Sequence, residues 1–314
     1  MHFISAQRLT AMLNNKRTLH AQKIGLGLAL LVAAFLIAAQ LVGMGIISGP
    51  QTEQTDSLAV NKSEKLDAAY QQTQKLAANA ISASDEGQIL FGDLHIHSTF
   101  SPDAYLMSLP STGGFGAHPV ADACDYARFC SSLDFWPIND HAEASTPDRW
   151  AKAIKAVRQC DAISGDGDTQ DLVSYLGWEW TQAGITPEGH YGHKNVVLRG
   201  LSDEEITTRP IASGPEPGSP SLMSGVPDIL VGALSLLTVN QRGLETARFN
   251  RDMLAVPKCD TTLASPELPS DCLEEAVTAG DLFRKLDEWE NVESMVIPHG
   301  TTWGMYTPLG SNWV

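Results

Sequence analysis

The chain has 314 residues and a formal net charge of −16, with 37 acidic residues against 21 basic ones. A protein with this negative charge repels polyanions. The charge therefore argues against nucleic acid as a partner and against binding to anionic lipid headgroups. Five cysteines are too few for a disulfide scaffold, and because no two of them stand in a Cys-x2-Cys pair, a zinc site built on cysteine is disfavoured.

The first predicted element is a membrane-spanning helix. Residues 24–47 are uncharged and almost wholly apolar, and as a helix they would cross a hydrocarbon core of about 30 Å. Basic residues precede this run and acidic residues do not. The positive-inside rule therefore keeps residues 1–23 in the cytoplasm and places the chain after Ser48 on the periplasmic side of the inner membrane. The alternative is a cleaved signal peptide that releases a secreted protein, but the length of the run favours a retained signal anchor.

Two further segments follow the predicted anchor. Residues 48–85 are rich in Gln, Ala, Lys and Ser, with widely spaced apolar residues, and are expected to form a partly helical stalk. Residues 86–314 fit one domain. An insertion into this domain is expected at about residues 213–272, where the chain opens with Pro, Gly and Ser, continues with an apolar helical stretch at residues 226–237 and ends in a polar loop.

Short apolar runs alternate with helical patterns in the predicted domain. Strands are predicted at residues 88–94, 133–138, 172–176, 195–198 and 295–297. Helices are predicted at residues 120–131, 147–162 and 273–289. Such alternation, with polar residues at the C-terminal ends of the strands, is typical of a β/α layer or barrel whose site collects ligands from successive strand ends.

Five histidines stand at or beside these strand ends. His95 and His97 are the most informative, because alternation along a strand sends both imidazoles to one face, where they can bind one metal ion while the residue between them enters the core. An isolated His-x-His pair is as often structural. Here His141, His193 and His299 occupy similar places, which favours a metal site.

These histidines belong to five ordered motifs. The motifs are Phe91-Gly92-Asp93-Leu94-His95-Ile96-His97-Ser98 with Ser101-Pro102-Asp103, Leu133-Asp134-Phe135 leading to Asn139-Asp140-His141-Ala142-Glu143, Gly177-Trp178-Glu179-Trp180, Gly192-His193-Lys194-Asn195-Val196 and Ile297-Pro298-His299-Gly300. From about residue 88 to the C-terminus the chain therefore resembles the polymerase and histidinol phosphatase (PHP) superfamily of metal-dependent hydrolases, and within it the DUF3604 group.

The resemblance implies a distorted (β/α)7 TIM-like barrel that holds two or three divalent ions, zinc, manganese or iron, and most commonly hydrolyses phosphoesters. The metal ligands that it implies are His95, His97, Asp103, His141, Glu179, His193 and His299, with Glu179, His141 and Asp103 as the catalytic residues. His190 lies in a glycine-rich loop three residues before His193 and competes for the same position, but the Asn and Val that follow His193 favour His193.

One departure from the PHP pattern stands at the C-terminal end. Members of the superfamily usually close their site with a late Asp-x-His motif, and none follows His299. We therefore expect either a fragment with an incomplete barrel or a site built without that pair. A non-catalytic domain that binds metal or another ligand is the alternative.

The residues themselves indicate the chemistry. A carboxylate that bridges two divalent ions lowers the pKa of a shared water, while the ions stabilise charge on a phosphoryl oxygen. Glu179 is the bridging candidate, because Gly177 before it allows close approach. Asp140 and Glu143 are candidates to orient the ring of His141 or to bind metal themselves.

Other polar residues of the motifs have weaker assignments. Asp93 is a candidate to orient His95, and Lys194 or Arg199 could meet an anionic substrate or could equally be a surface charge. No P-loop, Gly-x-Ser-x-Gly elbow or dinucleotide fingerprint is present, which disfavours NTPases, serine hydrolases and Rossmann enzymes. We predict a metal-dependent phosphoesterase that acts on a small anionic molecule, with amides and sulfate esters as alternative substrates.

The cysteines allow one pairing to be predicted. Cys259 and Cys272 bracket a proline-rich loop and are expected to form a disulfide. Cys124 and Cys130 are six residues apart in a predicted helix, which is a poor distance for a bond between them. Cys160 is therefore expected to pair with one of these two or to stay free.

Overall fold

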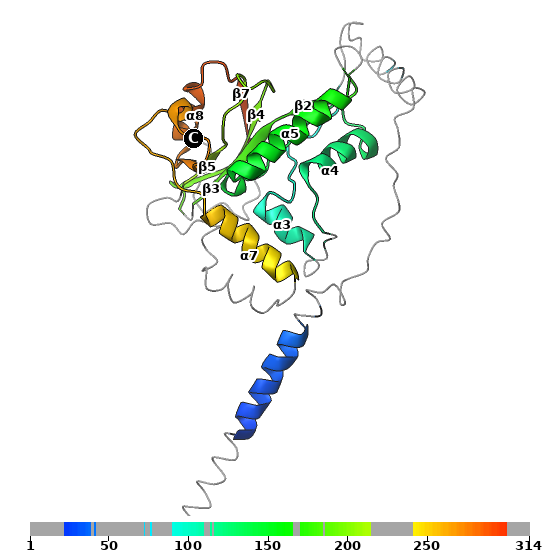
Figure 1. Cartoon of the computed structure of the whole chain (residues 1–314), viewed down its shortest axis with the longest axis vertical. Coiled ribbons are helices and arrows are strands. Elements are labelled where there is room, and N and C mark those ends of the chain that lie inside the picture. The colour runs from blue at the N-terminus through cyan, green and yellow to red at the C-terminus, as the bar shows by residue number, and fades with distance from the viewer. Residues whose placement is uncertain are drawn as a thin grey trace, which may run out of the picture.

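The structure is a computed structural model that describes residues 22–38, 41, 72, 76, 90–109, 114, 116–165, 170–184, 186–214 and 241–299. Residues 22–38 are helical. From residue 102 onward the elements, with short 3-10 or π turns written η, are α3 (Pro102–Ser108), α4 (Val120–Asp125), η2 (Tyr126–Cys130), β1 (Phe135–Pro137), η3 (Ala142–Ala144), α5 (Pro147–Ile163), β2 (Val173–Tyr175), β3 (Gly177–Ala183), β4 (His190–Leu198), β5 (Ile211–Ser213), α7 (Gln241–Leu254), η5 (Ser265–Glu267), β6 (Glu274–Ala276), α8 (Ala279–Asp287) and β7 (Ser294–His299) (Figure 1).

The strands beside the predicted ligands form two sheets that are joined by backbone hydrogen bonds. β1 pairs with β2 in parallel, whereas β3, β4 and β7 form an antiparallel sheet in that order. The two sheets meet where Leu198 N donates to Leu176 O at 2.8 Å and Glu179 N donates to Asp140 O at 3.1 Å. The end of β1 is thereby held beside the start of β3.

The segment at residues 91–96 runs along the other side of β1 without forming a regular strand. Asp134 N donates to Phe91 O at 2.7 Å, and Asn139 N donates to Ile96 O at 2.8 Å. Gly92 makes an isolated parallel bridge with Phe135. These few bonds bring the His-x-His segment to the edge of β1.

The two faces of β3 have different roles. Alternation sends Trp178 and Trp180 to one face, where both side chains are fully buried. Trp178 packs edge to face against Trp150 of α5, with ring centroids 5.9 Å apart, and Trp180 Nε1 donates to Ala276 O of β6 at 3.0 Å. The opposite face presents Glu179. Aromatic packing on one face therefore fixes the position of a carboxylate on the other.

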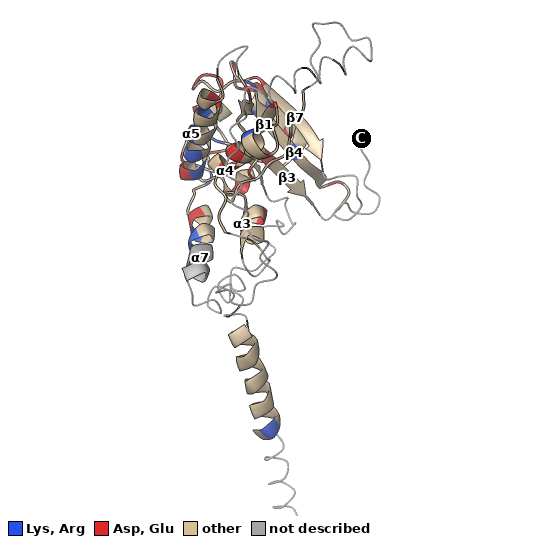
Figure 2. Cartoon of the chain, turned by 90° about the vertical axis from the view of Figure 1, so that its right-hand side faces the viewer, with Lys and Arg blue, Asp and Glu red and all other residues tan. Residues whose placement is uncertain are grey.

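Helix α5 lies against the strands in Figure 1 and is the longest of the elements from α3 to β7. Its N-terminus is capped by Thr146, whose hydroxyl accepts from Arg149 N at 3.3 Å, and Pro147 occupies the first turn. Charged residues lie on its outward face (Figure 2). A disulfide between Cys124 and Cys160 ties α4 to the buried side of α5.

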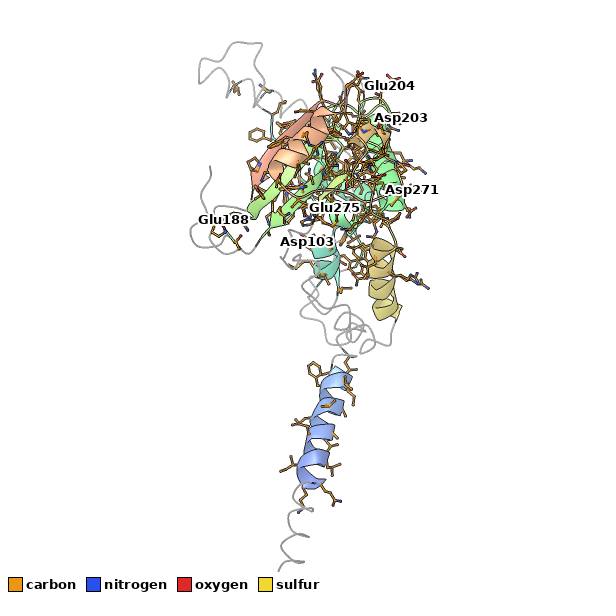
Figure 3. All side chains as sticks on the ribbon, turned by 90° about the vertical axis from the view of Figure 1, so that its left-hand side faces the viewer. Asp103, Glu188, Asp203, Glu204, Asp271 and Glu275 are labelled. Atoms are coloured by element: carbon orange, nitrogen blue, oxygen red, sulfur yellow. A yellow bond between two sulfur atoms is a disulfide. The ribbon has the colours of Figure 1, made fainter. Side chains whose placement is uncertain are left out.

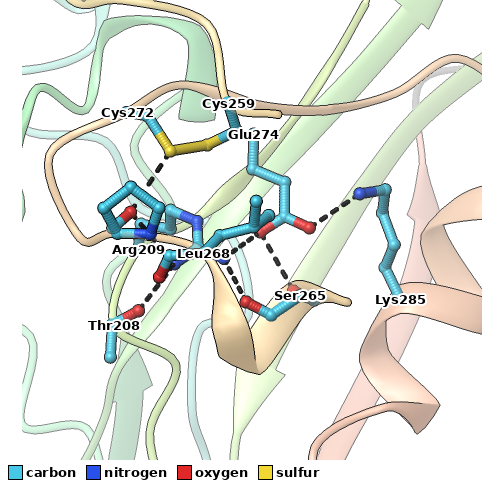
Figure 4. The surroundings of a disulfide bond; sticks show 9 residues. Thr208, Arg209, Cys259, Ser265, Leu268, Cys272, Glu274 and Lys285 are labelled. Carbon is cyan, nitrogen blue, oxygen red and sulfur yellow. Dashed lines mark hydrogen bonds and ion pairs between the residues drawn. A yellow bond between two sulfur atoms is a disulfide. The ribbon is translucent and has the colours of Figure 1, made fainter. Parts of the chain in front are cut away.

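A buried cluster of charges lies beside the second disulfide, Cys259–Cys272 (Figure 4). Glu274 of β6 is 1% exposed, with Arg209 Nη2 2.8 Å from its Oε2 and Lys285 Nζ 2.8 Å from its Oε1. Arg209 also donates to three carbonyl groups of the loop that the disulfide closes. Because a buried carboxylate is tolerated only with partners of this kind, the cluster joins the loop to β6 and α8.

The predicted TIM-like barrel is wrong, since no closed barrel forms in the described residues. The strands make a parallel pair, an antiparallel three-stranded sheet and a second parallel pair of β5 with β6. A parallel barrel needs a crossover of a dozen or more residues, usually a helix, between successive strands. β3 ends at Ala183 and β4 begins at His190, so the chain turns back there and the two strands are antiparallel.

Individual elements also differ from the predictions. The strand predicted at residues 88–94 is reduced to the bridge at Gly92 among the residues described there. The helix predicted at residues 273–289 begins as β6 and is helical only from Ala279. Part of the predicted polar loop is helix α7. The other predicted strands and helices are present with shifted ends.

The predicted transmembrane helix and signal anchor are corrected by the structure. Among the described residues, no helix has both the length and the apolar character needed to cross a membrane. The prediction rested on the apolar run at residues 24–47, of which residues 24–38 and 41 are described and helical. The periplasmic or secreted location deduced from this run is corrected with it. Residues 39, 40 and 42–47 lie outside the described residues.

Several other predictions fall on residues outside the described part of the chain. They concern the basic segment up to residue 21, the stalk at 48–85 apart from residues 72 and 76, the apolar stretch at 226–237 and the residues after His299. The domain bounds at 86–314 and the insertion at about 213–272 stay predictions.

Gly177 opens β3 where the backbone leaves no room for a side chain. A Cβ atom there would lie 2.3 Å from Val196 O of β4. We expect Gly177→Ala to lower the free energy of unfolding, measured by urea denaturation, by about 1–3 kcal/mol, because overpacking strains the backbone. Gly280→Ala is the matched control, since its Cβ would meet only Thr278 Oγ1 at 3.8 Å. Equal stabilities of the two variants would contradict this account.

The Cys259–Cys272 disulfide spans a sequence separation of 13 residues. We expect the double variant Cys259→Ala/Cys272→Ala to lose about 3 kcal/mol of unfolding free energy in non-reducing urea, because the cross-link restricts the unfolded chain. Cys130→Ala is the control, since Cys130 is an exposed free thiol and surface changes usually stay within about 0.5 kcal/mol. A double variant as stable as this control would show that the loop is held without the bond.

Candidate metal centre

Three strands of the antiparallel sheet present ligands on one face. Glu179 lies on β3, His193 on β4 and His299 at the end of β7. His193 stands opposite Thr181 of β3 on one side and opposite His299 on the other. Because residues opposite each other in a sheet, and residues two apart on one strand, share a face, the three predicted ligands point to the same side.

The other predicted ligands come from the β1 side. His141 follows β1 and forms an isolated parallel bridge with Glu179, which places it directly beside β3. His95 and His97 belong to the segment along the edge of β1, and Asp103 lies in the first turn of α3, where Figure 3 labels it. The structure therefore brings together all seven residues that the sequence indicated.

Glu179 stands at the centre of this group. Its side chain is 1% exposed, and each of its two oxygens faces imidazoles. Oε2 lies 2.8 Å from His97 Nε2, 3.8 Å from His95 Nε2 and 3.8 Å from His141 Nε2, and Oε1 lies 2.5 Å from His193 Nδ1 and 3.7 Å from His299 Nε2. One buried carboxylate is therefore shared by five histidines.

Asp103 is the second carboxylate of the group and is more open. Its Oδ1 lies 3.1 Å from His97 Nδ1 and its Oδ2 lies 3.7 Å from His141 Nε2. The side chain of Asp103 is 56% exposed, whereas that of His97 is 10% exposed. Asp103 thus lies at the solvent side of the group, opposite the buried Glu179.

The seven residues form three overlapping groups, each positioned to hold a metal ion. The groups are His95 with His97 and Glu179, His97 with Asp103 and His141, and Glu179 with His193 and His299. In each group the ligand atoms lie within 4.8 Å of one another. Imidazole nitrogen and carboxylate oxygen are ligands that zinc, manganese and iron accept.

One ring nitrogen supports this assignment. His299 Nε2 is buried and makes no hydrogen bond to the described residues, although it faces the carboxylate of Glu179 at 3.7 Å. A buried polar atom without a partner is costly in a folded protein. A cation bound by this nitrogen would supply the partner, so the residues present are suited to a metal ion.

The two carboxylates are held in their charged forms. Burial alone would raise the pKa of Glu179, but hydrogen bonds with His193 and His97 and the nearby His141 hold that pKa well below its usual range. The pKa of Asp103 is likewise held well below its usual range, because its partners His141 and His97 outweigh its desolvation. Ionised carboxylates are the form that binds metal.

The histidines divide into two kinds. Burial by itself would lower the pKa of His97, but Asp103 and Glu179 raise it to about 10. Burial, together with neighbouring histidines, lowers the pKa of His299 to about 4 despite the charge of Glu179, and it lowers the pKa of His95. Neutral imidazole is the ligand form, so His95 and His299 are held ready to bind, whereas His97 would release a proton when a metal binds.

Three side chains that the sequence did not assign to the site contact its ligands. Asn195 Nδ2 donates to Leu94 O at 2.7 Å, and its Oδ1 lies 3.1 Å from His95 Nδ1. The hydroxyl of Ser101 lies 3.0 Å from His97 Nδ1, and that of Thr181 contacts Glu179. Thr181 and Asn195 each stand two residues from a ligand on the same strand, and this alternation was the signal that could have revealed them.

Asp140 and Glu143, the candidates for orienting the ring of His141, have different hydrogen-bond partners. The carboxylate of Asp140 accepts from Ser98 N at 2.6 Å and from Ser98 Oγ at 2.7 Å, and so is directed away from the ring. Glu143 Oε1 accepts from Ser213, and Oε2 lies 3.8 Å from His141 Nδ1. Neither carboxylate makes a hydrogen bond to the ring in the described structure.

The remaining candidates lie elsewhere. Asp93 accepts from the backbone of His95 at 2.9 Å and not from its ring. Lys194 lies over Trp180 on the core-facing side of the sheet, 5.1 Å from the ring centroid, and Arg199 pairs with the exposed Glu293.

His193 takes the ligand position for which His190 was the competing candidate. His190 Nδ1 lies 3.0 Å from Gly184 O in the turn that joins β3 to β4, and His190 belongs to none of the three groups. The register explains the choice, because His193 stands opposite Thr181 and His299, whereas His190 lies at the irregular start of β4.

No protein-family model, no curated protein and no solved structure matches this chain. The resemblance to the PHP superfamily therefore stays a prediction that rests on the sequence motifs alone. The metal centre rests on the geometry of its own side chains.

We expect Glu179→Gln to weaken metal binding at least tenfold, because the loss of an outer partner alone often costs 10–100-fold and Glu179 is shared by two of the three groups. Isothermal titration of the metal-free chain with Zn²⁺ or Mn²⁺ measures this change. Glu188→Gln is the matched control, since Glu188 lies exposed in the turn between β3 and β4 (Figure 3). An affinity equal to that of wild type would remove Glu179 from the ligand set.

Proposed function

We propose that this chain is a metal-dependent hydrolase and that its substrates are phosphoesters of small molecules. The observation that carries the proposal is the buried carboxylate of Glu179, which faces five imidazoles and is shared between neighbouring ligand groups. Two or three divalent ions, zinc, manganese or iron, are proposed to occupy these groups. The motifs shared with the PHP superfamily support the same proposal.

Divalent ions bound there would supply the polarisation of water and of a phosphoryl oxygen that phosphoester hydrolysis needs. In this proposal Glu179 would be a ligand in both groups to which it belongs, because its two oxygens face different histidines. His97, Asp103 and His141 form the group on the solvent side.

The open side of the centre suits the approach of a substrate. The side chain of His95 is 44% exposed and that of Asp103 is 56% exposed, whereas Glu179 is almost fully shielded from solvent. A substrate would therefore meet the ligand groups from the side of His95 and Asp103. Shielding on the Glu179 side keeps bulk water away and strengthens the electrostatic interactions there.

Elemental analysis of the purified full chain, after dialysis against metal-free buffer, tests the first part of the proposal. We expect two or more equivalents of zinc, manganese or iron. Less than one equivalent in a folded sample that also takes up no added metal would contradict it.

The second part is tested by hydrolysis of p-nitrophenyl phosphate and bis(p-nitrophenyl) phosphate. We expect the double variant His95→Ala/His97→Ala to lose metal and at least about 100-fold in activity, since two ligands of one group are removed. His118→Ala is the matched control, because the ring of His118 is exposed, faces Asp122 and belongs to none of the three ligand groups. Full activity of the double variant, or no activity of the metal-loaded wild type toward a broad phosphoester panel, would refute the assignment.

A further inference from the structure

Thr181 lies among three of the candidate metal ligands, Glu179, His141 and His193. It stands two residues after Glu179 on β3 and so shares its face. In the register it is opposite His193 of β4, and His141 lies beside it because His141 bridges with Glu179. No other hydroxyl among the described residues contacts three of the seven ligands.

The hydroxyl of Thr181 is within hydrogen-bond distance of all three neighbours. It donates to Glu179 Oε1 at 2.7 Å. Its oxygen also lies 3.1 Å from His141 Nδ1 and 3.1 Å from His193 Nδ1.

The number of hydrogens decides the direction of these bonds. A threonine hydroxyl has one hydrogen and two lone pairs. A carboxylate can only accept, so the hydrogen of Thr181 goes to Glu179 and the hydroxyl oxygen can only accept from a ring nitrogen. His141 must therefore carry its hydrogen on Nδ1. In the neutral ring, the form that binds metal, Nε2 then has the free lone pair, and this atom lies 3.7 Å from Asp103 Oδ2 and 3.8 Å from Glu179 Oε2.

Other side chains near His141 do not provide this bond. Glu143 Oε2 lies 3.8 Å from Nδ1, beyond hydrogen-bond distance, and Asp140 is bound to Ser98. In the described part of the chain, Thr181 is the hydrogen-bond partner of the His141 ring.

We infer that Thr181 is a positioning residue that fixes the tautomer of His141, so that Nε2 is the atom that binds metal. The inference rests on the metal-binding part of the proposed function and adds a residue outside the ligand set. A histidine ligand normally donates its second N–H to a fixed acceptor, and here a hydroxyl that is itself held by Glu179 takes that place.

Replacement of the hydroxyl tests the inference. Thr181→Val keeps the shape and removes the hydrogen bonds, and Thr181→Ser keeps the hydroxyl. Thr207→Val is a matched control, because the buried hydroxyl of Thr207 makes no hydrogen bond to the described residues. We expect Thr181→Val in the full chain to bind Co²⁺ or Zn²⁺ about 10–100-fold more weakly than wild type. Thr181→Ser is expected to recover most of the affinity, and Thr207→Val to bind as wild type does.

Isothermal titration and the visible spectrum of the Co²⁺-loaded chain measure these effects, and melting of the metal-free variants shows whether each is folded. An affinity of Thr181→Val equal to that of wild type would overturn the inference. So would an equal loss in Thr181→Ser. If Thr181→Val does not fold, Thr181→Ala replaces it in the comparison with Thr181→Ser.

A double-mutant cycle with His141→Ala tests whether Thr181 acts through His141. We expect the loss caused by Thr181→Val to be smaller in the His141→Ala background, because the ring that it orients is gone. Strictly additive losses would overturn the inference. A wild-type chain that binds metal but hydrolyses no phosphoester would contradict the proposed hydrolase alone, and a wild-type chain that binds no metal would contradict both.

Discussion

The burial of one carboxylate is the constraint on which the candidate site depends. Glu179 is 1% exposed, and a charge so far from solvent is tolerated only when it is paired or bound to a cation. The chain meets this requirement with imidazoles from both sides of β3 and with the hydroxyl of Thr181. The positions of the histidines can therefore be understood as the surroundings that an ionised Glu179 needs.

The same strand also belongs to the core. Trp178 and Trp180 alternate with Glu179, and their rings pack toward α5 and β6 on the far side of the sheet. Gly177 lets the strand approach β4 closely enough for this packing. Successive side chains of a strand point to opposite faces, so the site and the core share the backbone of β3. A shift of this backbone that repacks either tryptophan would move the carboxylate as well.

The residues of the candidate site could be picked out from the sequence, whereas their scaffold could not. His95, His97, His141, His193 and His299 stood beside short apolar runs, and imidazoles in that pattern indicate metal chemistry whatever the sheet order. Periodicity locates a strand but not its direction, and the short turn between Ala183 and His190 reverses β4 and excludes a local parallel crossover.

The disulfides and the polar contacts of the site show the same difference: features local in sequence were predicted, and those that depend on tertiary packing were not. The Cys259–Cys272 bond joins residues close in sequence and was predicted, and this prediction is confirmed. The Cys124–Cys160 bond depends on how α4 packs against α5, so the sequence left its partner open. Thr181 and Asn195 were missed because a hydroxyl or an amide has no chemical signature until its neighbours in space are known.

The segment at residues 91–97 is joined to β1 by few backbone hydrogen bonds and an isolated bridge, yet it supplies two of the seven candidate ligands. A cation bound by His95, His97 and Glu179 would therefore link this segment to β3. Metal binding would then complete the tertiary structure as well as the site. The free energy of metal binding would then add to the stability of the fold, because the ion binds only the folded chain.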